Sequence, residues 1–69
     1  MTKKELFSLL IELDFKKTDY DKHTLFKNGK ELIVFPKGKL SERHYLSTLT
    51  QLYMNGRIKE KKFKKMIKN

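Results

Sequence analysis

The sequence contains no cysteine, which excludes disulfide bonds and every metal site that needs thiolate ligands. It also lacks any apolar run close to the roughly 20 residues that a helix needs to cross a bilayer. The opening residues, MTKKELFSLLIELD, place glutamates around a short apolar run and offer no small-residue cleavage site, so they do not resemble a signal peptide. We therefore expect a cytoplasmic protein.

Acidic residues are scarce relative to basic ones. The 69 residues include 17 lysines and arginines but only 8 aspartates and glutamates, so the formal net charge is +9. This excess favours a polyanionic partner, with nucleic acid first, an acidic protein second and an anionic membrane third. It is densest in KEKKFKKMIK, residues 59–68, which a solvated helix face explains equally well. We expect one domain, residues 1–69, with a modest core and no elaborate cavity.

Only one proline and three glycines interrupt the chain, and three of its segments have helical signals. A capping box, TKKE at residues 2–5, predicts a helix over residues 3–13 with one apolar stripe. Ser41 is the expected N-cap of a second helix, which the Asn-Gly pair at residues 55–56 ends as a left-handed cap. A short last helix is expected over residues 59–67.

Three strands are expected between the first two helices. Residues 15–20 alternate loosely, and the Asn-Gly pair at residues 28–29 favours a type I′ hairpin, which needs positive φ at both central residues. The hairpin joins residues 22–27 to residues 30–35, and Pro36 ends the second strand. The predicted fold is α+β, in the order α-β-β-β-α: a three-stranded antiparallel sheet with helices on one face and a short extra C-terminal helix.

The predicted turn also fixes the pairing and the faces of the hairpin. With residues 28 and 29 in the turn, Lys27 faces Lys30 and His23 faces Val34. Alternation assigns one face to the core, comprising Thr24, Phe26, Ile33 and Phe35, and leaves His23, Leu25, Leu32 and Val34 on the other. An exposed apolar face beside basic residues favours a partner over bare solvent. The alternative is that the helices cover this second face and leave His23 as a hydrogen-bonded rim residue.

Several segments resemble the HicA family of toxins from bacterial toxin–antitoxin systems, nearly from end to end. They are the amphipathic helix KKELFSLLIELDF, the histidine and hairpin KHTLFKNGKELIVFP, the helix in LSERHYLSTLTQLYMNG and the closing IKEKKFKKMI. The family commonly shows a Gly-Ser/Thr-His triplet, an aromatic residue three positions later and a strand ending in Val-Pro. Here the triplet reads Asp21-Lys22-His23, and the aromatic residue is Phe26. Only the histidine of the triplet is kept.

The resemblance implies a double-stranded-RNA-binding-like fold and metal-independent cleavage of messenger RNA by an essential histidine. It also implies inhibition by a cognate HicB-like antitoxin. No membrane partner is expected. His23 is then the catalytic residue, because an imidazole can take a proton from a ribose 2′-hydroxyl or give one to a leaving 5′-oxygen. No cofactor is expected, and neither histidine has metal-ligand spacing, so no metal is expected either.

The other candidate contacts to RNA follow from their position along the chain. The lysines nearest to the histidine that can offset charge on the reacting phosphate are Lys22, Lys37 and Lys39. Tyr20 could stack on a base, although packing at the core edge is the alternative. Arg43 could bind phosphate, but solvation at a helix end explains it equally well. The competing function is a non-catalytic RNA-binding module or a basic protein that docks on an acidic partner.

The remaining histidine and the phenylalanines have structural interpretations. His44 falls near the start of the second helix, away from its apolar stripe, and is expected to be solvated. The phenylalanines expected in the core are Phe7, Phe15, Phe26, Phe35 and Phe63.

Overall fold

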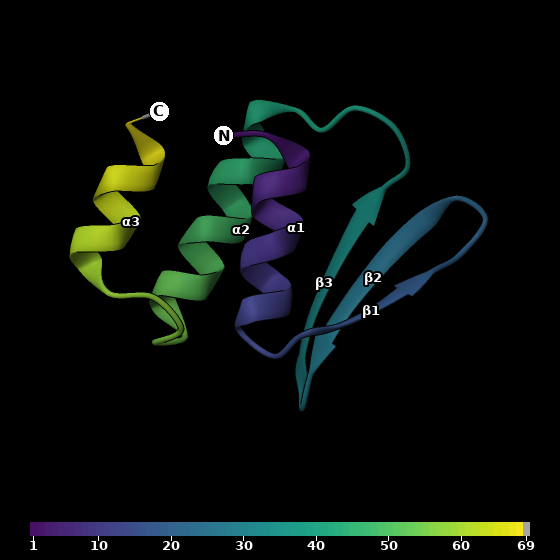
Figure 1. Ribbon diagram of the computed structural model, residues 1–69, viewed down its shortest axis with the longest axis horizontal. Helices are drawn as coiled ribbons and strands as arrows, with labels where there is room; N and C mark the ends of the chain where they lie inside the picture. Colours follow the sequence, from purple (N-terminus) through teal and green to yellow (C-terminus); the bar gives the residue numbers. More distant parts are fainter. Residues whose placement is uncertain (69) are drawn as a thin grey trace.

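The structure, a computed structural model, describes residues 1–68 as three helices and one sheet (Figure 1). In chain order the elements are α1 (Lys3–Glu12), β1 (Lys16–Asp19), β2 (His23–Asn28), β3 (Glu31–Pro36), α2 (Glu42–Met54) and α3 (Glu60–Ile67). The strands form one antiparallel sheet in the order β1-β2-β3. This confirms the predicted α+β fold: the α-β-β-β-α order of double-stranded-RNA-binding-like domains, followed by a short extra helix.

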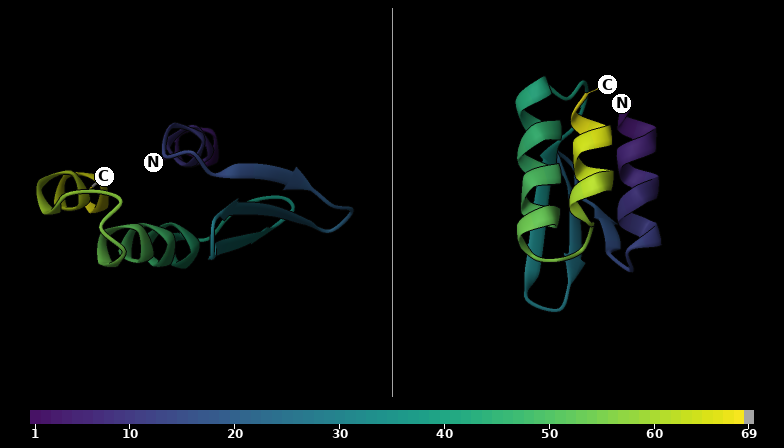
Figure 2. Two further views of the ribbon diagram at one scale, coloured as in Figure 1. Left: turned by 90° about the horizontal axis from the view of Figure 1, so that it is seen from below. Right: turned by 90° about the vertical axis from the view of Figure 1, so that its left-hand side faces the viewer.

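All three helices lie on one side of the sheet (Figure 2). α1 and α2 lie next to the sheet, and α3 lies on their outer side, so the layers run sheet, α1 with α2, then α3. The core fills the space between the sheet and the first two helices and contains Leu6, Leu9, Leu10, Phe15, Phe26, Ile33, Phe35, Leu40, Leu49, Leu52 and Ile58. Within residues 1–68, no helix has the length and apolar character needed to cross a membrane.

The ends of α1 and α2 follow from local chemistry. The predicted capping box is present, with Thr2 Oγ1 accepting from Glu5 N at 3.2 Å and Glu5 Oε1 accepting from Thr2 N at 2.8 Å. α1 ends at Glu12, one residue before the predicted end, because Asp14 has a φ of 67° and turns the chain toward β1. Gly56 does the same after α2, with a φ of 74°. Both turns are closed by backbone bonds of the Schellman type.

The predicted register of the β2–β3 hairpin is wrong by two residues. The turn consists of Gly29 and Lys30, and His23 pairs with Pro36 rather than with Val34. Gly29 is the only residue of this turn with positive φ, at 61°, which fits a type II′ turn with glycine first. The predicted type I′ turn would require positive φ at two residues.

Asn28 explains the shift, because it is a strand residue here and not a turn residue. Its side-chain amide donates to the Leu13 carbonyl at 3.1 Å and so ties the hairpin to the end of α1. In the ladder it pairs with Glu31. A shift of two residues leaves every side chain on its predicted face, since side chains alternate with a period of two.

The two faces of the hairpin therefore match the prediction. Thr24, Phe26, Ile33 and Phe35 are buried under the helices. On the other face, which we call the open face, Leu32 and Val34 are 51% and 49% exposed. This excludes the alternative in which the helices cover the side that carries His23.

The phenylalanines are core residues to different degrees. Phe15, Phe26 and Phe35 are buried, as predicted. Phe7 is only partly buried and packs against Phe26 and Phe35 with ring centroids 4.8 and 5.2 Å away. Phe63 is also partly buried, and it is the residue through which α3 stacks on α2.

Candidate nucleic-acid interface

His23 lies at the end of the sheet where the turn Asp21-Lys22 joins β1 to β2. The Tyr20 amide donates to the His23 carbonyl at 2.8 Å and closes this turn. On the other side, His23 pairs with Pro36 of β3. Because β2 is the middle strand, the histidine has a neighbour on each side within the sheet.

The imidazole of His23 is exposed and has no partner within the described chain. Among residues 1–68, no group forms a hydrogen bond or an ion pair with its ring. Tyr20 beside it is 57% exposed. A neutral imidazole with two accessible nitrogens can donate at one and accept at the other, which is the requirement for proton transfer to or from a ligand.

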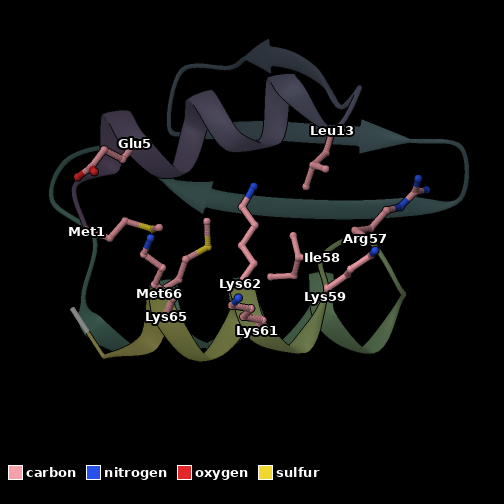
Figure 3. A pocket seen from close by; sticks show the side chains of 10 residues that line it. All are labelled: Met1, Glu5, Leu13, Arg57, Ile58, Lys59, Lys61, Lys62, Lys65 and Met66. Atoms are coloured by element: carbon pink, nitrogen blue, oxygen red, sulfur yellow. The ribbon is translucent and has the colours of Figure 1, made fainter.

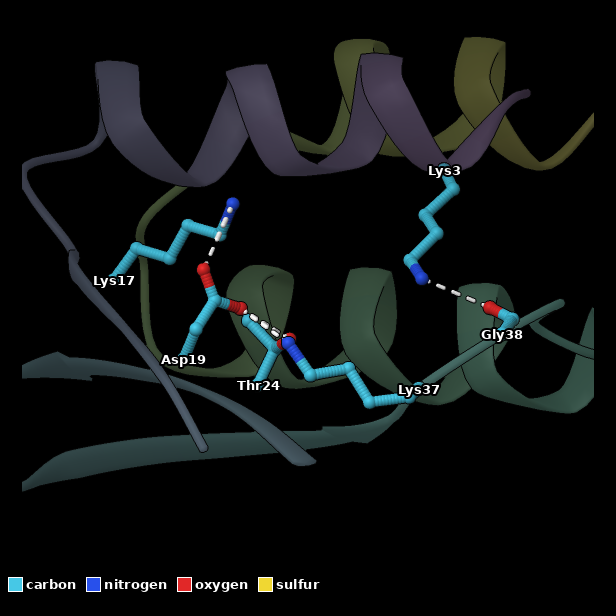
Figure 4. Close-up of polar contacts among 6 residues, drawn as sticks. All are labelled: Lys3, Lys17, Asp19, Thr24, Lys37 and Gly38. Carbon is cyan, nitrogen blue, oxygen red and sulfur yellow. Dashed lines mark hydrogen bonds and ion pairs between the residues drawn. The ribbon is translucent and has the colours of Figure 1, made fainter. Parts of the chain in front are cut away.

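The backbone brings Lys37 to the same end of the sheet as Lys22. The Lys37 amide donates to the Lys22 carbonyl at 3.2 Å. The two side chains differ, however, because the Lys37 ammonium turns toward the helices and bonds Asp19 Oδ1 at 2.6 Å (Figure 4). Lys22 is exposed and forms no such bond with any of residues 1–68. Of these two lysines, Lys22 is the one available to a phosphate.

Asp19 organises this end of the sheet, and the sequence analysis did not single it out. Its Oδ1 also accepts from Thr24 Oγ1 at 2.9 Å, and its Oδ2 lies 3.6 Å from Lys17 Nζ (Figure 4). The Lys37 hydrogen bond, followed by that from Thr24, lowers the pKa of Asp19 to about 2. Asp19 and Thr24 are direct cross-strand partners, a signal that appears only when the register is known.

Lys39 and Arg43 lie farther along the chain and are not part of this group. Lys39 is exposed in the connection from β3 to α2, which Lys3 Nζ fixes to α1 by donating to the Gly38 carbonyl at 2.8 Å (Figure 4). Arg43 lines a hollow among the helices, beside the C-terminal part of α3. Of the predicted contacts, the structure therefore groups Tyr20, Lys22, His23 and Lys37 and separates Arg43 from them.

His44 is not the solvated residue that the sequence analysis predicted. It is half-buried, its Nδ1 accepts from the Ser41 amide at 3.1 Å, and the same nitrogen lies 2.9 Å from Ser41 Oγ. It occupies the position that glutamate or glutamine takes in a capping box. The neutral ring then carries its hydrogen on Nε2, because Nδ1 is the acceptor.

The open face consists of three rows of cross-strand neighbours. From one end to the other, the rows are Lys16, Lys27 and Leu32; Thr18, Leu25 and Val34; and Tyr20, His23 and Pro36. Successive rows lie about 7 Å apart, twice the rise of a strand residue. The face is thus basic at one end, apolar in the centre, and carries the histidine and the tyrosine at the other end.

The basic row contains two lysines directly opposite each other. Lys16 of β1 pairs with Lys27 of β2, and neither forms an ion pair with any carboxylate of residues 1–68. Like charges at directly opposed positions destabilise a sheet. A bound anion between the two ammonium groups removes this cost.

No metal site accompanies these groups in the part of the chain that the structure describes, where no cluster of three or more histidine, aspartate or glutamate side chains could hold an ion. Comparisons of the sequence with protein-family models and with curated proteins, and of the fold with solved structures, give no match.

Proposed function

We propose that the protein is a toxin-type ribonuclease that cleaves messenger RNA without a metal, uses His23 as its general acid or base, and is inhibited by a cognate HicB-like antitoxin. The observation that carries this proposal is the exposed imidazole of His23, which has no partner among residues 1–68 and stands at one end of an uncovered, basic sheet face. The resemblance to the HicA family supports the same reading of this residue.

The protein needs to supply only proton transfer and charge stabilisation, because RNA carries its own nucleophile. The ribose 2′-oxygen attacks the adjacent phosphorus, the 5′-oxygen leaves, and the product is a 2′,3′-cyclic phosphate. His23 accepts the proton from the 2′-hydroxyl or donates one to the leaving oxygen, a contribution of about 10²–10⁴-fold. Lys22, next to it in the turn, offsets the charge that develops on the phosphate oxygens.

The rest of the open face suits a strand of RNA. The exposed ring of Tyr20 can stack on a base adjacent to the scissile bond, and such stacking contributes about 1–3 kcal/mol per base. Lys16 and Lys27, two rows away, can hold a phosphate farther along the strand. Between them, the exposed Val34 provides apolar surface for a second base.

A second function, RNA binding without cleavage, is favoured by one observation. Cleavage of this kind uses both a base and an acid, and His23 is the only histidine at this end of the sheet, since His44 caps α2. One imidazole performs one of the two proton transfers at a time. A binding module needs neither transfer, only the cations and the tyrosine.

The test is cleavage of a long unstructured RNA in the presence of a chelator, from about pH 5 to about pH 9. A ribonuclease should give a bell-shaped or stepped profile, and His23→Ala should abolish turnover while RNA affinity and circular dichroism stay unchanged. Arg43→Ala, a cation outside the group around His23, is the matched control and should cleave normally. RNA bound but left intact by the wild type would support the binding module instead.

A further inference from the structure

A groove lies between α1 and α3, on the far side of the molecule from the open face (Figure 3). Its volume is about 770 Å³. The apolar residues that line it are Met1, Leu13, Ile58 and Met66. The charged residues that line it are Glu5, Arg57, Lys59, Lys61, Lys62 and Lys65, and most of them belong to α3 or its approach. We call this feature the α1–α3 groove.

Three of the lysines that line the α1–α3 groove are not neutralised by any of residues 1–68. Lys59, Lys61 and Lys62 form no ion pair with any of residues 1–68. Figure 3 shows Lys62 extending from α3 across the groove toward α1. Glu5 is the one carboxylate in the lining, and it is already engaged, since its Oε1 accepts from the Thr2 amide at 2.8 Å. The groove therefore offers several unpaired cations beside an apolar floor.

α3 itself is only partly attached to the body of the protein. None of its eight residues is fully buried, and its main anchor is Phe63, whose ring stacks on Tyr53 of α2 at 4.6 Å and 7°. An isolated helix of this length is not stable in water, so α3 depends on what packs against it. A ligand in the α1–α3 groove would cover the exposed side of Met66 and add to that packing.

We propose that the α1–α3 groove binds an acidic amphipathic helix of a partner protein. The apolar side chains of that helix would insert between α1 and α3, and the carboxylates of the same helix would face Lys59, Lys61 and Lys62. Recognition of a helix in a groove uses apolar anchors at positions i, i+3 or i+4, and i+7. Eight residues of α3 span about 12 Å, which seats about two turns of such a helix.

An anionic membrane and RNA fit this site less well than an acidic helix does. A helix that binds a membrane presents its apolar residues on an outward convex surface, whereas here they form the floor between two helices. Binding of RNA depends on accessible cations that contact its phosphates, and the apolar floor of the groove would add no such contact. Charge and apolar surface are combined in the way that an amphipathic helix requires.

The site is independent of the proposed chemistry at His23. The layer formed by α1 and α2 separates the α1–α3 groove from the sheet, so both surfaces can be occupied at once. Loss of RNA cleavage in a His23 variant would therefore leave this proposal unaffected, and loss of binding at the groove would leave cleavage unaffected.

The probe is a fluorescent peptide of about 14 residues with leucines at i, i+3, i+4 and i+7 and glutamates at most other positions. We expect it to bind about tenfold more tightly than a scrambled peptide of the same composition. Lys62→Glu should weaken binding about fivefold, and Lys61→Glu to a similar extent. Lys30→Glu, an equal charge reversal in the β2–β3 turn, should leave the affinity unchanged, as should His23→Ala.

Amide chemical shifts locate the bound peptide, and they should change along α1 and α3. Equal affinity for the ordered and scrambled peptides would overturn the proposal, because it would reduce the interaction to non-specific charge attraction. An equal effect of Lys30→Glu and Lys62→Glu would do the same. Failure of the peptide to bind, with shifts at these residues on addition of a single-stranded RNA or of phosphatidylserine vesicles, would assign the surface to that ligand instead.

Discussion

The two faces of the sheet differ less in their composition than in what their polar side chains contact. On the core face, the polar groups have partners: Asp19 with Thr24, Lys17 and Lys37, Asn28 with the Leu13 carbonyl, and Glu31 with Arg57. On the open face, Lys16, Thr18, Tyr20, His23 and Lys27 have no side-chain partner among residues 1–68. Lys17 and Lys27 are both exposed, yet only Lys17 is neutralised. A surface is available to a ligand where its polar side chains have no partner within the described chain, and exposure alone does not identify it.

The largest difference in the free energy of unfolding should be between apolar substitutions on the two faces of the sheet. Phe26→Ala removes a fully buried ring that packs against Phe7 and Phe35, and we expect a loss of about 3–5 kcal/mol in the free energy of unfolding. Leu32→Ala on the open face should cost less than about 1 kcal/mol. Urea unfolding of both variants measures the contrast. Similar losses would mean that the open face is covered in solution.

The next effect concerns a partnered charge at the border of the core. Arg57 Nε and Nη2 both contact Glu31 Oε1 at 2.7 Å, and Arg57 also lies over the ring of Phe15. Arg57→Met keeps the bulk but removes both donors, so unfolding free energy should fall by about 1–2 kcal/mol. Lys61→Met, which removes a charge with no partner, is the control and should change stability by less than about 0.5 kcal/mol. A loss of the same size in both would show that the ion pair adds nothing.

A third contrast depends on pH. The pKa of Asp19 is lowered from 3.8 to about 2, mainly by Lys37, so the folded state favours the ionised carboxylate. The resulting stabilisation is complete above the unfolded pKa and is lost as the pH falls from about 4 through about 2. Asp19→Asn should therefore flatten the loss of stability with acid in this window, and Lys37→Met should reduce it in part. Unchanged acid unfolding curves in both variants would contradict the assignment.

The smallest effect on stability should have the opposite sign to the others. Lys27→Glu replaces a like-charge pair with Lys16 by an attractive one, so the protein should become more stable by about 0.3–1 kcal/mol. The same change should weaken the proposed binding of RNA, because the row of Lys16 and Lys27 loses one of its two cations. Thermal unfolding and RNA titration at one ionic strength give both values. A variant that gains stability and keeps its affinity would place the RNA elsewhere.

Sequence patterns with a local cause predicted the fold well. The capping box at Thr2 and the glycine after α2 act within one turn of chain, and both occur as expected. The hairpin register was not accessible, because Asn28 is held in β2 by the carbonyl of Leu13, a residue distant in sequence. A turn signal read from two residues cannot include that contact.

In the candidate site, too, features with a local cause were predicted and those that depend on contacts between side chains were not. Strand alternation alone places His23 on one face with Leu25, Leu32 and Val34, so this grouping was predicted despite the wrong register. Which of the two faces the helices cover does not follow from alternation and was left open. The engagement of Lys37 by Asp19 and the capping role of His44 were missed, since each depends on a distance between side chains. In hindsight, the Ser41 to His44 spacing is that of a capping box with an unusual last residue.

The pleat of the β2–β3 hairpin also bears on how this protein can change over evolutionary time. A slip of β3 against β2 by an even number of residues keeps β3's side chains on their own face, whereas an odd slip exchanges them. An odd slip would expose Ile33 and Phe35 and bury Val34 and Leu32. Changes of pairing between these strands should therefore be tolerated only in steps of two, and the surface around His23 is inherited through a parity that selection on the core alone maintains.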